Sequence, residues 1–261
     1  MGQGNVPHSR LLIGLVCLFF TSSLTGCLSN SQHVEGIELT INYENTNGTI
    51  VESYIDGDLI STTNVILVFD FSNTISENKL VSYGIQIINY SSISVDSNIE
   101  SKISVEFSHH GIYEIIAYAT DETNYQENQS ITVRIEHQID WLESNTYDPI
   151  PLPIIPYPNN GGTLPSAIII NSTVENPVLI ENIGGGREVE ITWRLLDEQD
   201  DACQSKNEIV YEGEQVNWKT IHFNTVEAHD LSISYDDGQD YIDVHHSVLI
   251  QYHPVESAPN I

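Results

Sequence analysis

Basic residues are scarce in this sequence: its 261 residues include 8 Lys and Arg against 37 Asp and Glu, a formal net charge of −29. A surface this acidic repels phosphate backbones and anionic lipid headgroups, which excludes nucleic acid as a partner. The same charge favours solubility and loose binding of cations.

Long hydrophobic runs are also missing. The longest, "LLIGLVCLFFTSSL" at residues 11–24, has about fourteen residues, which is too short to cross a bilayer comfortably as a permanent helix. It follows a polar lead that ends in Arg10, and small residues come after it. This arrangement predicts a secretory signal peptide, with a signal anchor or a buried helix as the alternatives.

The run ends in "LTGC", residues 24–27, which resembles the lipobox of prokaryotic lipoproteins. The resemblance implies cleavage between Gly26 and Cys27 and a lipid on the Cys27 sulfur. Each buried methylene contributes about 0.8 kcal/mol, so two or three acyl or isoprenoid chains would hold the protein at the outer face of the cell membrane. The mature chain would then keep Cys203 as its one unmodified thiol, in a loop or as a small buried side chain, and no internal disulfide.

Helical periodicity is absent from the remaining sequence, which instead alternates apolar and polar residues in short segments rich in Ile, Val, Tyr and Thr. Seven such segments lie between Ile37 and Glu136, and more follow from Ser166, for example "REVEITWRLLD" with Trp193 on the apolar face. The period of two, at this spacing, is typical of strands in β-sandwiches. The sequence therefore predicts an all-β fold.

One segment, "GIYEIIAYATD" at 111–121, is similar to a characteristic strand of PKD-type immunoglobulin-like domains. The alternating residues that carry the similarity are Gly111, Tyr113, Ile115, Ala117, Ala119 and Asp121. The resemblance implies a seven-stranded sandwich over residues 36–137. It also implies that Tyr113 buries its ring while its hydroxyl reaches the backbone.

Six of the ten prolines fall in residues 138–165. Proline fixes φ and removes a hydrogen-bond donor, which favours an extended spacer, or a docking peptide for a partner, over a central strand. The full prediction is two immunoglobulin-like β-sandwich domains joined by a proline-rich spacer after a signal peptide. The expected divisions are signal peptide 1–26, polar tether 27–35, first sandwich 36–137, spacer 138–165, second sandwich 166–257 and tail 258–261.

Motifs for catalysis and metal binding are missing: there is no G-x-S-x-G, P-loop, G-x-G-x-x-G, HExxH or paired Cys/His spacing. The sequence has ten histidines. Asp243 and His245 share a strand face, and His222 or His229 could approach it from neighbouring strands. No cofactor is indicated. Acidic turns leave weak binding of calcium as a possibility. Its candidate ligands are Asp121, Asp236, Asp237 and Asp240.

Two further features concern the surface. N-glycosylation sequons occur at Asn47, Asn89, Asn128 and Asn171. The aromatic rings that could form a carbohydrate-binding face, or simply pack in the core, are Trp141, Trp218, Tyr211 and Tyr241.

These observations favour a lipid-anchored extracellular protein with a binding, adhesive or structural role toward an unknown surface protein or glycan. The alternative is an enzyme, or an enzyme's accessory subunit, that acts on extracellular carbohydrate or protein.

Overall fold

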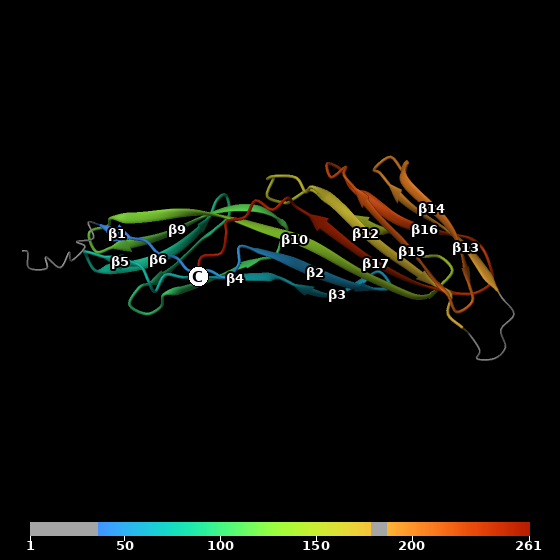
Figure 1. Ribbon diagram of the computed structural model, residues 1–261, viewed down its shortest axis with the longest axis horizontal. Coiled ribbons are helices and arrows are strands. Elements are labelled where there is room, and N and C mark those ends of the chain that lie inside the picture. The colour runs from blue at the N-terminus through green and yellow to red at the C-terminus, as the bar shows by residue number, and fades with distance from the viewer. Residues whose placement is uncertain (1–35, 179–186) are drawn as a thin grey trace, which may run out of the picture. The chain divides into compact units, whose positions relative to one another are not determined.

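The computed structural model describes residues 36–178 and 187–261, whose regular elements are all β-strands (Figure 1). The predicted all-β class is confirmed, and no described helix has the length and apolarity that a membrane crossing requires. The signal peptide, the Gly26–Cys27 cleavage site and the tether lie outside the described residues.

The first of two hydrophobic cores is enclosed by strands from the N-terminal half of the chain. These strands are β1 (Ile37–Glu38), β4 (Val65–Asp70), β5 (Ile75–Ser76), β6 (Leu80–Ile87), β7 (Ser92–Asp96), β8 (Lys102–Phe107) and β9 (Gly111–Asp121). In β9 the alternate residues from Gly111 to Asp121 are buried, as the sequence pattern predicts. The Tyr113 hydroxyl donates a hydrogen bond to the carbonyl of His109 at 2.7 Å, so the expected contact with the backbone is present.

The second core lies between two further layers of strands. One layer contains β12 (Ala167–Glu175), β15 (Gln215–His222) and β17 (Ile242–Gln251). The other is a four-stranded sheet in the order β11 (Leu152–Ile154), β16 (His229–Asp237), β13 (Glu188–Leu196) and β14 (Ala202–Tyr211). Trp193 on β13 is fully buried between them, as its place in the alternating pattern predicts.

A single long strand, β10 (Gln126–Thr146), contributes to both cores (Figure 1). Its first part pairs antiparallel with β9, its second part pairs antiparallel with β17, and β2 (Asn47–Ile55) runs parallel to its middle. β2 in turn pairs with β3 (Asp58–Thr63). The nine-stranded sheet is thus continuous from β15 to β7 through β10.

The spacer expected at residues 138–165 therefore takes a different form from the prediction. Its first nine residues belong to β10, because the alternation of buried side chains continues past residue 137 to Ile139 and Trp141. Leu152 and Ile154 are buried on β11, which is an edge strand and therefore tolerates Pro153.

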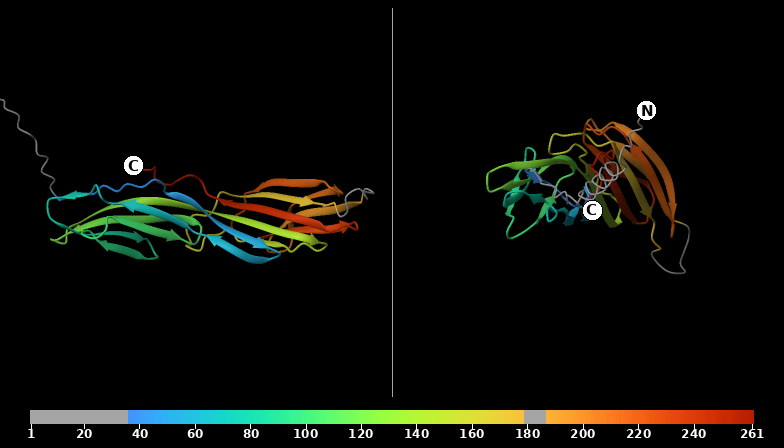
Figure 2. Two further views of the ribbon diagram at one scale, coloured as in Figure 1. Left: turned by 90° about the horizontal axis from the view of Figure 1, so that it is seen from below. Right: turned by 60° about the vertical axis from the view of Figure 1, so that its left-hand side comes forward.

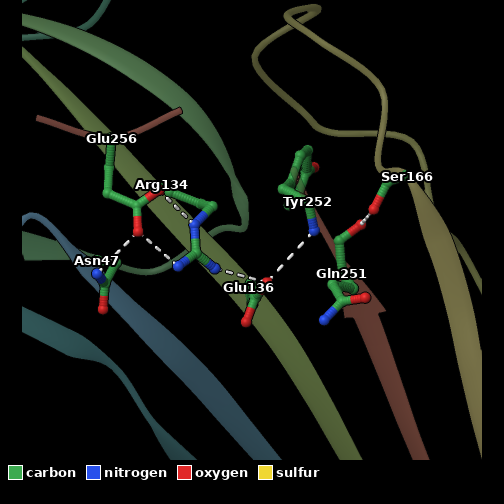
Figure 3. A network of polar contacts seen from close by, with 7 residues as sticks. All are labelled: Asn47, Arg134, Glu136, Ser166, Gln251, Tyr252 and Glu256. Atoms are coloured by element: carbon green, nitrogen blue, oxygen red, sulfur yellow. Dashed lines mark hydrogen bonds and ion pairs between the residues drawn. The ribbon is translucent and has the colours of Figure 1, made fainter. Parts of the chain in front are cut away.

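The C-terminal segment after β17 returns to the first core, as the left view of Figure 2 shows. The N–H of Ser257 donates to the carbonyl of Thr132 at 3.0 Å, and Asn260 exchanges two backbone hydrogen bonds with Tyr43. Side chains strengthen this return, because Arg134 of β10 binds Glu256 (Figure 3). Residues separated by most of the sequence thus stabilise the same region.

Candidate metal centre

Three side chains with metal-ligating atoms converge at one end of the second core: Cys203, His222 and His229. Their ligand atoms all lie within 4.8 Å of one another. Within the described parts of the chain, this is the one group of three or more Cys, His, Asp or Glu side chains that converges in this way.

Strand pairing explains why residues so far apart in the sequence meet. Leu196, the last residue of β13, pairs with Ala202 of β14 on one side and with Asp230 of β16 on the other. This register brings Cys203 and His229, the neighbours of those two residues, to the same end of the four-stranded sheet. His222 ends β15 in the opposite layer, so the cluster draws its ligands from both layers.

Both imidazole rings are buried and each has one nitrogen without a partner. His229 is 2% exposed, and its Nε2 lies 2.9 Å from the carbonyl oxygen of Asn224. A carbonyl can only accept, so His229 carries its proton on Nε2 and its Nδ1 keeps a free lone pair. This Nδ1 and the Nε2 of His222 are both buried and form no hydrogen bond with any residue in 36–178 or 187–261. Burying unsatisfied polar atoms costs free energy, which a bound cation would recover.

The electrostatic surroundings favour the neutral forms of His222 and Cys203 when no cation is bound. Burial, followed by the nearby His229, lowers the pKa of His222, so its imidazole is neutral at pH 7. Cys203 is exposed, but partial desolvation of its thiol raises the pKa, and the carboxylates of Asp197 and Glu227 raise it further. A metal ion binds neutral imidazole and thiolate, so it would displace the thiol proton and place a positive charge among these carboxylates.

The donor set suits a soft or borderline ion such as zinc or copper(I), because it combines one thiolate with two imidazoles. Tetrahedral zinc bonds place sulfur and nitrogen ligands roughly 3.3–3.6 Å apart. The ligand atoms lie within 4.8 Å of one another, which is close enough for small side-chain movements to complete this geometry. The cavities of 410, 190, 270 and 200 Å³ are lined by other residues.

Comparison with known proteins does not assign a family: no family model matches the chain, and no curated protein matches it. The lipobox and PKD resemblances therefore stay predictions.

The solved structures that resemble the chain do so at low similarity. One, of carbohydrate-binding modules from the β-sandwich superfamily, is 7% identical with a TM-score of 0.30, over 81% of this chain and 96% of the other. A Bacteroides ovatus glucan-utilization protein, SGBP-B, is 14% identical with a TM-score of 0.22, and the match covers 78% of this chain and 52% of the other. A structure of Clostridium perfringens ZmpB domains is 9% identical with a TM-score of 0.23, and the match covers 83% of this chain and 49% of the other. The chain spans about half the length of the last two, and TM-scores this low carry no argument about function.

The structure gives Asp121, one of the four calcium candidates, a structural role. Its carboxylate is buried and accepts hydrogen bonds from Thr123, Tyr125 and Asn78. The bond from the Thr123 hydroxyl is the main cause of its lowered pKa. Both oxygens are therefore engaged in closing the turn between β9 and β10.

The other three calcium candidates lie near the β16–β17 turn but bind different partners. Asp240 is buried and accepts a hydrogen bond from Arg187 at 3.0 Å. Asp236 accepts from the hydroxyl of Thr192, and Asp237 accepts from the N–H of Gly238. The three carboxylates do not form a converging group of ligands in the described residues.

All four sequon asparagines are exposed. Asn89 lies in the turn between β6 and β7, whereas Asn47, Asn128 and Asn171 lie in strands. Of the four aromatic candidates, Trp141 and Trp218 are buried in the second core, while Tyr211 and Tyr241 are exposed.

Sequence reasoning missed the cluster because its members come from three different strands. It placed His222 and His229 near Asp243 and His245, but the structure brings them to Cys203 instead. The spacing between Cys203 and the histidines follows no metal-binding motif. Only the register of β14, β15 and β16 reveals the site.

Proposed function

We propose that this protein is exported, anchored by lipid at Cys27 on the outer face of the cell membrane, and binds a zinc or copper(I) ion through Cys203, His222 and His229. The observation that carries the proposal is the convergence of three ligand atoms, two of them buried nitrogens without a partner. The lipobox resemblance supports the location.

The overall charge supports the same function. With Arg10 removed in the leader, the formal charge of the remaining chain changes from −29 to −30. Such a surface raises the local concentration of cations, and the thiolate and imidazoles would then select a soft or borderline ion from among them. The protein would thus hold a metal ion at the cell surface.

Titration of the purified protein with Co²⁺, a spectroscopic substitute for zinc, tests the metal site. We expect one equivalent to bind, with a thiolate-to-metal charge-transfer band and the visible absorption of tetrahedral Co²⁺, both reversed by added zinc. Cys203→Ser should abolish the charge-transfer band, and His229→Ala should weaken binding at least about tenfold. His245→Ala is the matched control, because His245 is an exposed histidine on β17. Absence of saturable binding at one equivalent would refute the metal function.

The anchor is tested separately by mass spectrometry of the N-terminus and by membrane fractionation. We expect a lipid-modified Cys27 at the start of the mature chain and loss of membrane association in Cys27→Ser. An uncleaved, unmodified N-terminus would refute the anchor and leave the metal site standing.

The second candidate function is binding to an extracellular polymer, as an accessory protein or an enzyme. The observation that favours it is the groove of 410 Å³ beside β4, the largest of the cavities described above. The three metal ligands do not line this groove, so the structure supports binding there rather than metal-assisted cleavage.

A further inference from the structure

One edge of β4 is paired at a single residue. The N–H and the carbonyl of Asp70 exchange hydrogen bonds of 2.9 and 2.8 Å with Asn42, which forms an isolated antiparallel bridge. β4 is paired with β8 along its other edge from Val65 to Asp70. In an antiparallel strand the backbone groups of alternate residues point to the same edge. The N–H and carbonyl groups of Val68 and Ile66 therefore point to the edge that Asn42 occupies beside Asp70.

The chain that bridges Asp70 does not continue along this edge. Tyr43 turns to pair with Asn260, with hydrogen bonds of 2.6 and 3.1 Å, and Thr46 then accepts a hydrogen bond from the N–H of Arg134. Within the described residues, the four backbone groups of Ile66 and Val68 on this side have no backbone partner. Unpaired groups of this kind are a template for another strand.

A groove of 410 Å³ occupies the space that the departing chain leaves. The side chains of Ile66 and Val68 are 62% and 46% exposed there and present apolar surface. Glu44 and Asp70 also line the groove, together with Lys102, which forms an ion pair with Asp70 at 3.4 Å. The groove, which Ile261 also lines, thus combines unpaired backbone and apolar side chains with the side-chain carboxylate of Glu44, which forms no ion pair in the described residues.

We propose that this groove binds an extended peptide strand of another protein, with apolar residues at alternate positions and a basic residue near Glu44. Only an extended backbone presents N–H and carbonyl groups at the repeat of Ile66 and Val68. Alternate apolar side chains match their exposed side chains. A second copy of this chain is disfavoured as the occupant, because its net charge of −29 would repel the first. The proposal is independent of the metal site.

The test uses the full-length protein and a set of synthetic heptapeptides. Valine occupies every second position of each peptide, threonine fills the rest, and a single lysine is moved through the threonine positions. We expect at least one peptide to shift the NMR signals of the Ile66 and Val68 amides and to slow their hydrogen exchange. N-methylation of that peptide on its bonding edge should weaken binding about tenfold or more, because main-chain hydrogen bonds provide the affinity.

Two substitutions test the side chains of the groove. Ile66→Lys should abolish binding with little effect on folding, because Ile66 is exposed. Glu44→Lys should weaken binding of the lysine peptide about fivefold and leave an all-threonine version unaffected. Ile60→Lys is the matched control, because Ile60 is an exposed isoleucine on β3, another edge strand.

Three results would overturn the proposal. In the first, no peptide of the set shifts the signals of Ile66 and Val68. In the second, the N-methylated peptide binds as well as its parent. In the third, the free protein is a dimer that Ile66→Lys converts to a monomer, which would identify a second copy as the occupant.

Discussion

Arg134 and Glu256 lie 122 residues apart in the sequence and form a bidentate ion pair (Figure 3). Nε of Arg134 donates to Oε2 of Glu256 at 2.8 Å, and Nη2 donates to Oε1 at 2.7 Å. Nη1 of the same guanidinium lies 2.6 Å from Oε1 of Glu136. Both members of the pair are about 15% exposed, so water screens the interaction only partly.

We expect Glu256→Gln to lower the free energy of unfolding by about 2 kcal/mol at pH 7, because a charge-assisted pair is lost and Arg134 keeps its charge. The hydrogen bond from Arg134 is the main cause that lowers the pKa of Glu256 from 4.5 to about 2. A carboxylate with a lowered pKa stabilises the fold above its unfolded pKa, and this contribution is lost as the pH falls.

The free energies of unfolding of the parent protein and of Glu256→Gln should therefore show their full difference above pH 4.5. This difference should shrink as the pH falls toward 2. Denaturant unfolding across this range is the measurement. Glu122→Gln is the control, since Glu122 is an exposed carboxylate without an ion pair in the described residues. A difference that persists unchanged at pH 2 would show that Glu256 acts through packing.

His246 should make stability depend on pH in a higher range. It is buried in the second core, where Nδ1 lies 2.8 Å from the Ser172 hydroxyl, which accepts a hydrogen bond from Nε1 of Trp193. Burial lowers its pKa from 6.5 to about 3. Below pH 6.5 the unfolded chain binds a proton at this residue and the folded chain does not. The free energy of unfolding therefore decreases as the pH is lowered.

His246→Phe should reduce this slope by up to about 1.4 kcal/mol per pH unit between pH 6 and pH 4. Denaturant midpoints measured at several pH values give the slope, which can be compared even if the variant is less stable overall. His245→Phe, at the exposed neighbouring position, should change the slope less, because His245 lowers the pKa of His246 only as a second cause after burial. An unchanged slope in His246→Phe would exclude His246 as the titrating group.

Strand positions and buried faces were predictable from the sequence because both follow from local alternation. Tyr113 and Trp193 are buried as predicted. The continuity of β10 was not recognised, because the polar residues His137 and Gln138 resemble the end of a strand. They lie where the strand passes between the two cores, and its alternation resumes with Ile139.

The candidate sites were less predictable, because they depend on pairing between distant segments. Nothing local shows that β2 runs parallel to β10, or that Tyr43 and Asn260 form a bridge across most of the sequence. The groove beside β4 exists only because of these pairings. Asp121 was taken for a possible ligand because its acidic turn is visible in the sequence, whereas the donors that satisfy it are visible only in the structure.

Gly84 on β6 gives a prediction about packing on the sheet. It lies opposite Tyr118 of β9, and a Cβ at Gly84 would lie 2.1 Å from Cζ of the tyrosine ring. Gly84→Ala should therefore cost about 2 kcal/mol, because the ring must move away. In a Tyr118→Ala background the same substitution should cost little, and urea unfolding of the four proteins of this cycle measures the coupling. Equal costs in both backgrounds would contradict the steric explanation.

Because β10 contributes to both cores, we expect that dividing the chain at residue 137, the boundary suggested by the sequence, does not give two parts that fold separately. A fragment of residues 36–137 ends β10 after His137, so the part of β2 from Val51 to Ile55 loses its parallel partner. The fragment also lacks the C-terminal segment, and with it the Arg134–Glu256 pair and the Tyr43–Asn260 bridge. These losses leave backbone groups of β2 and apolar residues of the first core without partners.

We therefore expect residues 36–137 alone to show poor NMR dispersion and no cooperative thermal transition. Residues 36–261 should unfold in one transition followed equally by tryptophan and tyrosine signals, because all three tryptophans lie in the second core. Extending the fragment to residue 146 restores β10 but not the C-terminal segment, so it separates the two contributions. A 36–137 fragment that melts cooperatively near the temperature of the longer chain would establish an independent domain and refute the structural role assigned to β10.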